Sequence, residues 1–234
     1  MTRRGAIAMA FAPATGSQPL FDGRTFSGWT LGDGGPVTHS WSIEDGTLAT
    51  VADARGRSDL LCTQPLRAFE LEFDFRLSRG SNTGVKYFVS QMLRYLNLEG
   101  SYGAIGLEFQ LATDDAEGVE HDDQRLGALY GILPVDKKPS YTVGEWGSAK
   151  LVCRADGCEH WINGQRVLAF DPTSASFKKR LREVAVDPGH SIVGAAAALV
   201  VLRRRASVMP EARIALQQHS TKAWFRSLRL RNLV

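Results

Sequence analysis

The chain has 234 residues, of which 44% are apolar, and its formal net charge is only +3. This length and apolar content suffice for one full core, and the 23 glycines suit a fold with many turns. The low charge argues against a nucleic-acid-binding protein, and the single cationic run, Arg203–Arg205, is expected in solvent. No apolar run reaches the roughly 18 residues needed for a membrane span.

The N-terminal segment, residues 1–18, is expected to lie outside a single domain that covers residues 19–234. Two arginines precede a short apolar run, Ala6–Ala12, which ends in an Ala-x-Ala pattern. This arrangement is typical of a shortened secretion signal and predicts a periplasmic or extracellular location. If the segment is a simple tail, the location is cytoplasmic.

Short strands separated by tight turns are expected along the chain. The clearest is Phe69–Leu77, where apolar and charged residues alternate, so that one face enters the core. Asp45-Gly46 and Asn163-Gly164 supply hairpin turns. The expected strands are Trp41–Ile43, Gly46–Leu48, Asp59–Thr63, Phe69–Leu77, Val85–Ser90, Gly103–Leu111, Lys150–Arg154, Cys158–Ile162, Gln165–Phe170, Ile214–His219 and Trp224–Leu230.

Two polar or mixed segments, Met92–Tyr102 and Asp114–Gln124, are expected to be long loops at the rim, where binding residues often lie. A third segment, Ser191–Pro210, combines alanines, an apolar run and three arginines. It is unsuited to a regular edge strand and is expected outside the sheets, as a short helix or an irregular loop.

The three cysteines do not form a metal-binding pattern. Cys62 is expected to be a small buried apolar residue. Cys153 and Cys158 face each other across the predicted hairpin, so a cross-strand disulfide and the packing of two reduced thiols are both open, with the reduced pair favoured.

Strand periodicity also selects polar residues that converge on one sheet face. Glu108 and Gln110 point away from their apolar neighbours, as does Lys86 on the preceding strand. We expect Glu108 at the centre of a concave sheet and these residues, with His160 and His219, in one groove. The six residues expected between the sheets are Phe69, Leu71, Phe73, Phe75, Leu107 and Phe109.

Several phrases, in order from Phe21 to Leu233, resemble the 3-keto-disaccharide hydrolase domain family. They are SNTGVKYFV at 81–89, IGLEFQLATDD at 105–115, LGALYGI at 126–132, GEW at 144–146, EHWING at 159–164 and ALQQHSTKAWFRSLRL at 215–230. The resemblance implies an all-β fold: a two-sheet antiparallel jelly-roll sandwich of the concanavalin A-like lectin/glucanase type. Two positions depart from the family pattern, Gly147 in place of Asn and Gln218 in place of Asp.

The resemblance implies cleavage of a 3-keto-glycoside. Hydrolysis by two carboxylic acids is disfavoured because the outward positions read Glu108, Gln110 and Ala112, so that a second acid is missing. A 3-keto group acidifies the C2 proton, and removal of that proton expels the leaving oxygen from C1; water then adds to the enone. Glu108 or His160 is the candidate base. Lys86 or a bound divalent metal ion is the candidate for stabilising the enolate, and His219 is the candidate acid.

Substrate contacts are expected from Asn82, Gln110, Trp161 and Gln217. The alternative function is a carbohydrate-binding domain without catalysis, in which Trp161 or Tyr102 stacks on a sugar. The two functions differ in whether Glu108, Lys86 and a histidine meet in one place.

Overall fold

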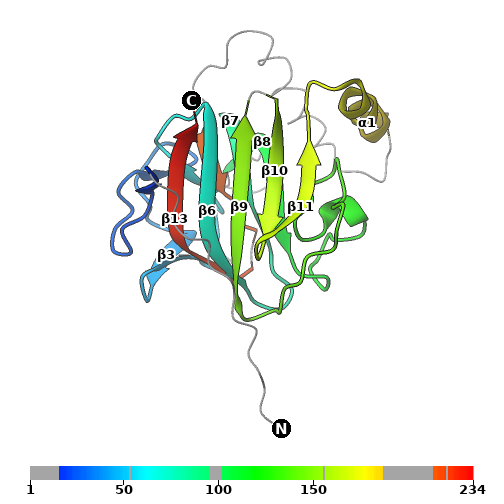
Figure 1. Cartoon of the computed structure of the whole chain (residues 1–234). Coiled ribbons are helices and arrows are strands. Elements are labelled where there is room, and N and C mark those ends of the chain that lie inside the picture. The colour runs from blue at the N-terminus through cyan, green and yellow to red at the C-terminus, as the bar shows by residue number, and fades with distance from the viewer. Residues whose placement is uncertain are drawn as a thin grey trace.

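A computed structural model describes residues 16–52, 54–94, 102–154, 156–186, 213–219 and 221–233. The expected signal segment, apart from its last residues, and the whole of the Ser191–Pro210 segment lie outside the described residues. The described chain folds into two antiparallel β-sheets, one behind the other (Figure 1). This arrangement confirms the two-sheet sandwich expected from the sequence.

The large sheet has the strand order β11-β10-β9-β6-β13-β4-β3, with β1 paired to β13, and it faces the viewer in Figure 1. Its strands are β1 (Gln18–Pro19), β3 (Trp41–Glu44), β4 (Thr47–Thr50), β6 (Ala68–Leu77), β9 (Trp146–Arg154), β10 (Gly157–Ile162), β11 (Gln165–Phe170) and β13 (Ala223–Leu233).

The small sheet has the order β2-β5-β12-β7-β8 and lies behind the large sheet. Its strands are β2 (Trp29–Leu31), β5 (Leu60–Cys62), β7 (Asn82–Arg94), β8 (Tyr102–Ala112) and β12 (Arg213–Leu216). The other elements are the 3-10 helix η1 (Asp122–Gln124) and the helix α1 (Ala175–Val186).

The core lies between the two sheets and includes the six residues expected there. Phe73 of β6 packs edge-on against Phe109 of β8, with ring centroids 6.3 Å apart, which joins the sheets through their apolar faces. Burial of a large apolar side chain contributes about 1.5–3 kcal/mol, so these residues dominate the stability of the sandwich. All six are at most 2% exposed: Phe69, Leu71, Phe73, Phe75, Leu107 and Phe109.

Some element boundaries differ from the sequence-based expectation. Strand β7 runs to Arg94, so the start of the expected Met92–Tyr102 loop is strand, and β12 ends at Leu216, before His219. Helix α1 was not anticipated. Its Ser174 hydroxyl accepts a hydrogen bond from the Phe177 amide (3.2 Å), as a capping residue does. No helix among the described residues is long and apolar enough to cross a membrane.

The pairing of Cys153 with Cys158 agrees with the predicted register. The two residues are directly opposite each other on β9 and β10, and both are buried. Their Sγ atoms are 2.7 Å apart, and Cys62 is buried, as expected. The structure thus confirms that the two side chains meet across the hairpin, while the reduced state of the pair stays a prediction.

Candidate functional site

Lys86 and Glu108 are directly opposite each other on β7 and β8. Their neighbours Tyr87 and Phe109 belong to the core between the sheets, so Lys86 and Glu108 point to the outer face of the small sheet. We call the outer face around these two residues the site face. The other outward residues of β8, beside the site face, have small side chains or none: they are Ala104, Gly106 and Ala112.

Glu108 is not on a central strand, contrary to the expectation. Strand β8 is the last strand of the small sheet, but the segment Leu126–Leu133 closes its outer edge. The Tyr130 amide donates a hydrogen bond to the Glu108 carbonyl (3.0 Å), and Gly127 and Ala128 exchange backbone hydrogen bonds with Gln110. This segment contains the LGALYGI phrase, whose structural role is to hold the strand that carries Glu108.

A buried ion pair supports the site face from the β5 side. Lys86 Nζ is 2.9 Å from Asp59 Oδ2, and both side chains are about 5% exposed or less. Asp59 also accepts hydrogen bonds from the amides of Ala104 (2.8 Å) and Gln218 (3.0 Å). Its carboxylate is thus fully engaged in holding Lys86 and two backbone segments, which leaves Glu108 as the available acid.

The environment of Glu108 favours a proton-transferring role. Burial raises the pKa of Glu108 from 4.5 to about 7; the positive charge of Lys86 opposes this rise and the negative charge of Asp59 adds to it. Its carboxyl group lies over Gly84, where an added Cβ would collide with Oε1 and lie 2.8 Å from Cγ. A glycine near the start of β7 therefore provides the space that the carboxyl group occupies.

Three acceptor oxygens without a hydrogen-bond donor belong to residues that adjoin Gly84 on the neighbouring strands. Within the described residues, Oε1 of Glu108, Oε1 of Gln110 and Oε1 of Gln217 are buried and unpaired. Gly84 is directly opposite Gln110, and its carbonyl accepts the amide of Gln217 (2.9 Å). Buried acceptors are normally satisfied, so this arrangement suits a ligand that brings several hydroxyl donors.

The other expected residues of this face occupy distinct places. Asn82 and Gln110 are buried and form a hydrogen bond, in which Gln110 Nε2 donates to Asn82 Oδ1 (3.2 Å). His219 is half-buried beyond the end of β12. Burial lowers the pKa of His219, and the charges of Arg57 and Lys86 lower it further. This favours the neutral imidazole rather than the proton donor that the sequence suggested.

His160 does not share the site face with Glu108, which corrects the expectation of one groove. It lies between the sheets, with no exposed surface, and its ring stacks on Phe109 at 4.1 Å. Nδ1 is 2.9 Å from the Gly127 carbonyl, and Nε2 is 3.0 Å from the Tyr87 hydroxyl. Burial lowers the pKa of His160 to about 4. Alternation along β10 places His160 on the inward face with Cys158 and Ile162. Of the two candidate bases named from the sequence, Glu108 is therefore the one on the site face.

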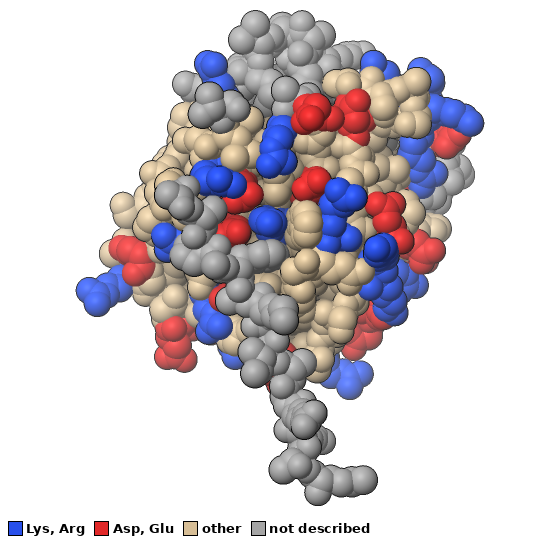
Figure 2. Space-filling model, in the orientation of Figure 1, with Lys and Arg blue, Asp and Glu red and all other residues tan. Residues whose placement is uncertain are grey.

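Trp161 is also separated from Glu108. It lies on the outer face of the large sheet, where its Nε1 donates to Glu159 (3.0 Å) and Lys150 lies 4.7 Å from its ring. Figure 2 shows this face, on which positive and negative residues are interspersed. The two sheets therefore stand between Trp161 and the site face. The side chain of Tyr102, the other stacking candidate, lies outside the described part of the chain.

The described residues do not assemble a metal centre. None of their histidines, cysteines and acids form a group of three or more that could hold a metal ion. On the site face, the ammonium group of Lys86 occupies the position beside Asp59 that a cation would take.

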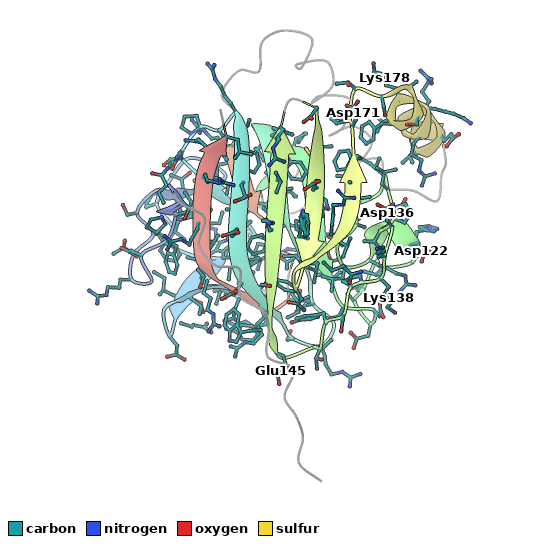
Figure 3. The ribbon with its side chains drawn as sticks, in the orientation of Figure 1. Asp122, Asp136, Lys138, Glu145, Asp171 and Lys178 are labelled. Carbon is teal, nitrogen blue, oxygen red and sulfur yellow. The ribbon has the colours of Figure 1, made fainter. Side chains whose placement is uncertain are left out.

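A pocket of about 600 Å³ lies near the end of β8 and is lined in part by Ala112, Asp114 and Tyr141. Arg125 pairs with Asp114 and Asp122 at its rim, both at 3.1 Å. Figure 3 shows Asp122 and Lys138 at one side edge of the molecule. Neither Lys86 nor Glu108 lines this pocket, but Ala112, an outward residue at the end of β8, does, so the pocket borders the site face.

The two departures from the family pattern have structural explanations. Gly147 lies beneath Phe75 and Tyr141, where a Cβ would be about 3.0 Å from both rings, so the packing of these rings leaves no room for the family's Asn side chain. Gln218 supports Asp59 through its amide, and its side chain donates to the Val51 carbonyl (2.7 Å). An acid at position 218 would place a second negative charge next to Asp59.

Two contributors to the site were missed in the sequence. Asp59 is an acid that immediately precedes the fully apolar strand β5, and Gly84 is a glycine within a strand. Both are anomalies that sequence patterns can reveal, because charged residues are seldom buried without a partner and glycine weakens strands.

The fold and the site face define a class: a lectin-like β-sandwich that presents a buried acid and unpaired acceptors on one sheet. A solved structure described as a putative glycosyl hydrolase from Parabacteroides distasonis has the same fold, with a TM-score of 0.70 and 22% identity over 94% of both chains. The exoplasmic/lumenal domain of VIP36, solved with Ca²⁺ and Man3GlcNAc, matches with a TM-score of 0.53 and 12% identity over 94% of this chain and 89% of that one.

The chain belongs to the 3-keto-alpha-glucoside-1,2-lyase-like domain family, whose model matches residues 16–231. A curated relative from Bacteroides thetaiotaomicron, a 3-keto-disaccharide hydrolase, is 26% identical over 94% of this chain and 79% of its own length. The chain is accordingly an enzyme of the class that acts on glycosidic bonds.

Proposed function

We propose that the protein cleaves the glycosidic bond of 3-keto-glycosides, including 3-keto-disaccharides, by elimination followed by addition of water. The observation that carries the proposal is the isolated carboxyl group of Glu108, whose pKa of about 7 suits a general base at neutral pH. The names of the family and of the curated relative support the substrate class.

The reaction requires one base, and the site face offers one. The Glu108 carboxylate removes the proton from C2, the electron pair forms the C1–C2 double bond, and the C1–O bond breaks with its electrons on the leaving oxygen. A proton from solvent or a site donor completes the released alcohol. Water then adds to C1 and a proton returns to C2, so that the net change is hydrolysis. The ammonium group of Lys86, directly opposite Glu108, stabilises the enolate charge.

Ordinary hydrolysis by two carboxylic acids has weaker support. The only other acid that the described structure places beside Lys86 is Asp59, and three hydrogen bonds hold it in its structural position. The neighbouring outward position holds the amide of Gln110. The unpaired acceptors around Gly84 serve binding, since sugar hydroxyl groups are donors.

The test compares a 3-keto-glucoside with its unoxidised parent, each carrying a chromogenic leaving group. The wild-type protein should release the leaving group only from the 3-keto compound, and Glu108→Gln should lower this rate by about 10²-fold or more. Glu72→Gln is a matched control, because Glu72 is a buried acid whose pKa burial also raises, but it lies on β6 of the large sheet. Equal cleavage of the parent glycoside, or an active Glu108→Gln protein, would contradict the proposal.

A further inference from the structure

We propose that His160 is a positioning residue, which fixes Lys86 and Glu108 in register from the opposite side of the small sheet. The inference rests on the function proposed for Glu108. It follows from the contacts of His160 with three groups: Tyr87, which is adjacent to Lys86, Phe109, which is adjacent to Glu108, and the carbonyl of Gly127.

The hydrogen bonds define the state of the imidazole. The Gly127 carbonyl can only accept, so Nδ1 of His160 carries the hydrogen and donates to it. In the neutral ring Nε2 then accepts from the Tyr87 hydroxyl. Both nitrogens are satisfied without a charge, in keeping with complete burial. The ring is thus a fixed connector between β10 of the large sheet and β7 of the small sheet.

The contact with Gly127 extends this connection to the backbone of Glu108. The Gly127 amide donates to the Gln110 carbonyl (2.9 Å), while its carbonyl accepts from His160. Three residues later, the Tyr130 amide donates to the Glu108 carbonyl (3.0 Å). His160 therefore anchors the segment that closes the outer edge of β8.

Gly127 is suited to this place by its lack of a side chain. It has a φ of +91°, and an added Cβ would lie 2.9 Å from Cγ2 of Val167 on β11. The close approach of this peptide to the large sheet allows its carbonyl to reach His160. A loss of the His160 contact would release the peptide and, with it, one neighbour of β8.

His160→Leu tests the proposal, with Ile162→Ala as a control for the loss of buried contacts on the same face of β10. We expect kcat for a 3-keto-glucoside to fall by about 10²-fold in His160→Leu with little change in KM, because small displacements of a reacting group have effects of this size. Amide hydrogen exchange at Gln110 and Tyr130 should become faster. His160→Gln can still donate a hydrogen bond to the Gly127 carbonyl. It should therefore have a higher kcat than His160→Leu and slower amide exchange at Gln110 and Tyr130.

Tyr87→Phe keeps the proposal testable if His160→Leu does not fold, because it removes one hydrogen bond without removing a ring. We expect Tyr87→Phe to lower kcat and to change KM by a smaller factor. The inference is wrong if His160→Leu and Tyr87→Phe fold and have the same kcat as the control Ile162→Ala, and the same amide exchange rates at Gln110 and Tyr130. An active Glu108→Gln protein would instead overturn the proposed function, and it would leave the hydrogen-exchange result unaffected.

Discussion

The carboxyl group of Glu108 occupies the space left by the missing side chain of Gly84, on the neighbouring strand. In Gly84→Ala, the new methyl group would lie 2.8 Å from Glu108 Cγ, so the carboxyl group must move. We expect kcat to fall by at least about tenfold, the effect of displacing a reacting group by a fraction of an ångström. Steady-state kinetics on a 3-keto-glucoside would measure it.

Gly35→Ala is the control for this substitution. Its Cβ would meet only the flexible side chain of Asp33, at 3.0 Å. It should therefore retain the wild-type kcat. If Gly84→Ala is equally active, the position of the Glu108 carboxyl group is not critical for the reaction.

The pH dependence of activity follows from the pKa of Glu108, which burial raises to about 7. A base acts in its deprotonated form, so kcat/KM should decrease about tenfold per pH unit below this value. A profile between pH 5 and pH 9 would show the midpoint. A flat profile across pH 7 would be inconsistent with Glu108 as the base.

The raised pKa of Glu108 makes the stability of the protein fall with rising pH, whereas the activity rises. Between pH 4.5 and about 7, the native protein keeps a proton on Glu108 that the unfolded chain has lost. The stabilisation linked to this proton is complete below pH 4.5 and is lost as the pH rises through about 7. Thermal unfolding of Glu108→Gln should accordingly depend less on pH over this interval than unfolding of the wild-type protein.

Lys86 and Asp59 should shift the activity profile in opposite directions. The charge of Lys86 lowers the pKa of Glu108 and that of Asp59 raises it. The midpoint of kcat/KM should therefore move above the wild-type value in Lys86→Met and below it in Asp59→Asn. Each variant should also lose about 3–5 kcal/mol of unfolding free energy, because it leaves half of a buried ion pair. Shifts in the same direction would show that the two charges do not act on Glu108.

Trp161→Ala should leave catalysis unchanged, although the sequence suggested Trp161 as a substrate contact. The residue lies on the outer face of the large sheet, beside Lys150 and Glu159. Values of kcat and KM within about twofold of the wild type are expected, because a residue that does not touch the substrate affects neither ground-state nor transition-state binding. A large rise in KM would indicate that the substrate binds on the large sheet.

Strand periodicity predicted the parts of the site that depend on alternation. It placed Phe109 in the core and Glu108 and Lys86 on the opposite face, as observed. The same rule applied to His160 gives an inward position, since Cys158 and Ile162 are apolar; its polar character had suggested otherwise. A neutral histidine is buried when both nitrogens find partners, and these partners come from distant segments.

Other features depend on contacts that no local pattern contains. Asp59 meets Lys86 across 27 residues of sequence, because β5 and β7 both pair with β12. The outer edge of β8 is closed by Leu126–Leu133, a segment that follows β8 in the sequence and folds back to pair with it. The motif spelled LGALYGI was noticed through its resemblance to a family, but its role became clear only from these backbone hydrogen bonds.

The most direct test of the central claim is the cleavage of a 3-keto-glucoside in D2O, followed by mass spectrometry and NMR of the released keto sugar at early times. Elimination removes the C2 proton and water addition returns one from solvent, so the product should carry deuterium at C2. Parallel samples without protein and with Glu108→Gln correct for spontaneous exchange. A product that retains hydrogen at C2 while the leaving group is released would contradict proton removal by Glu108 and indicate direct hydrolysis.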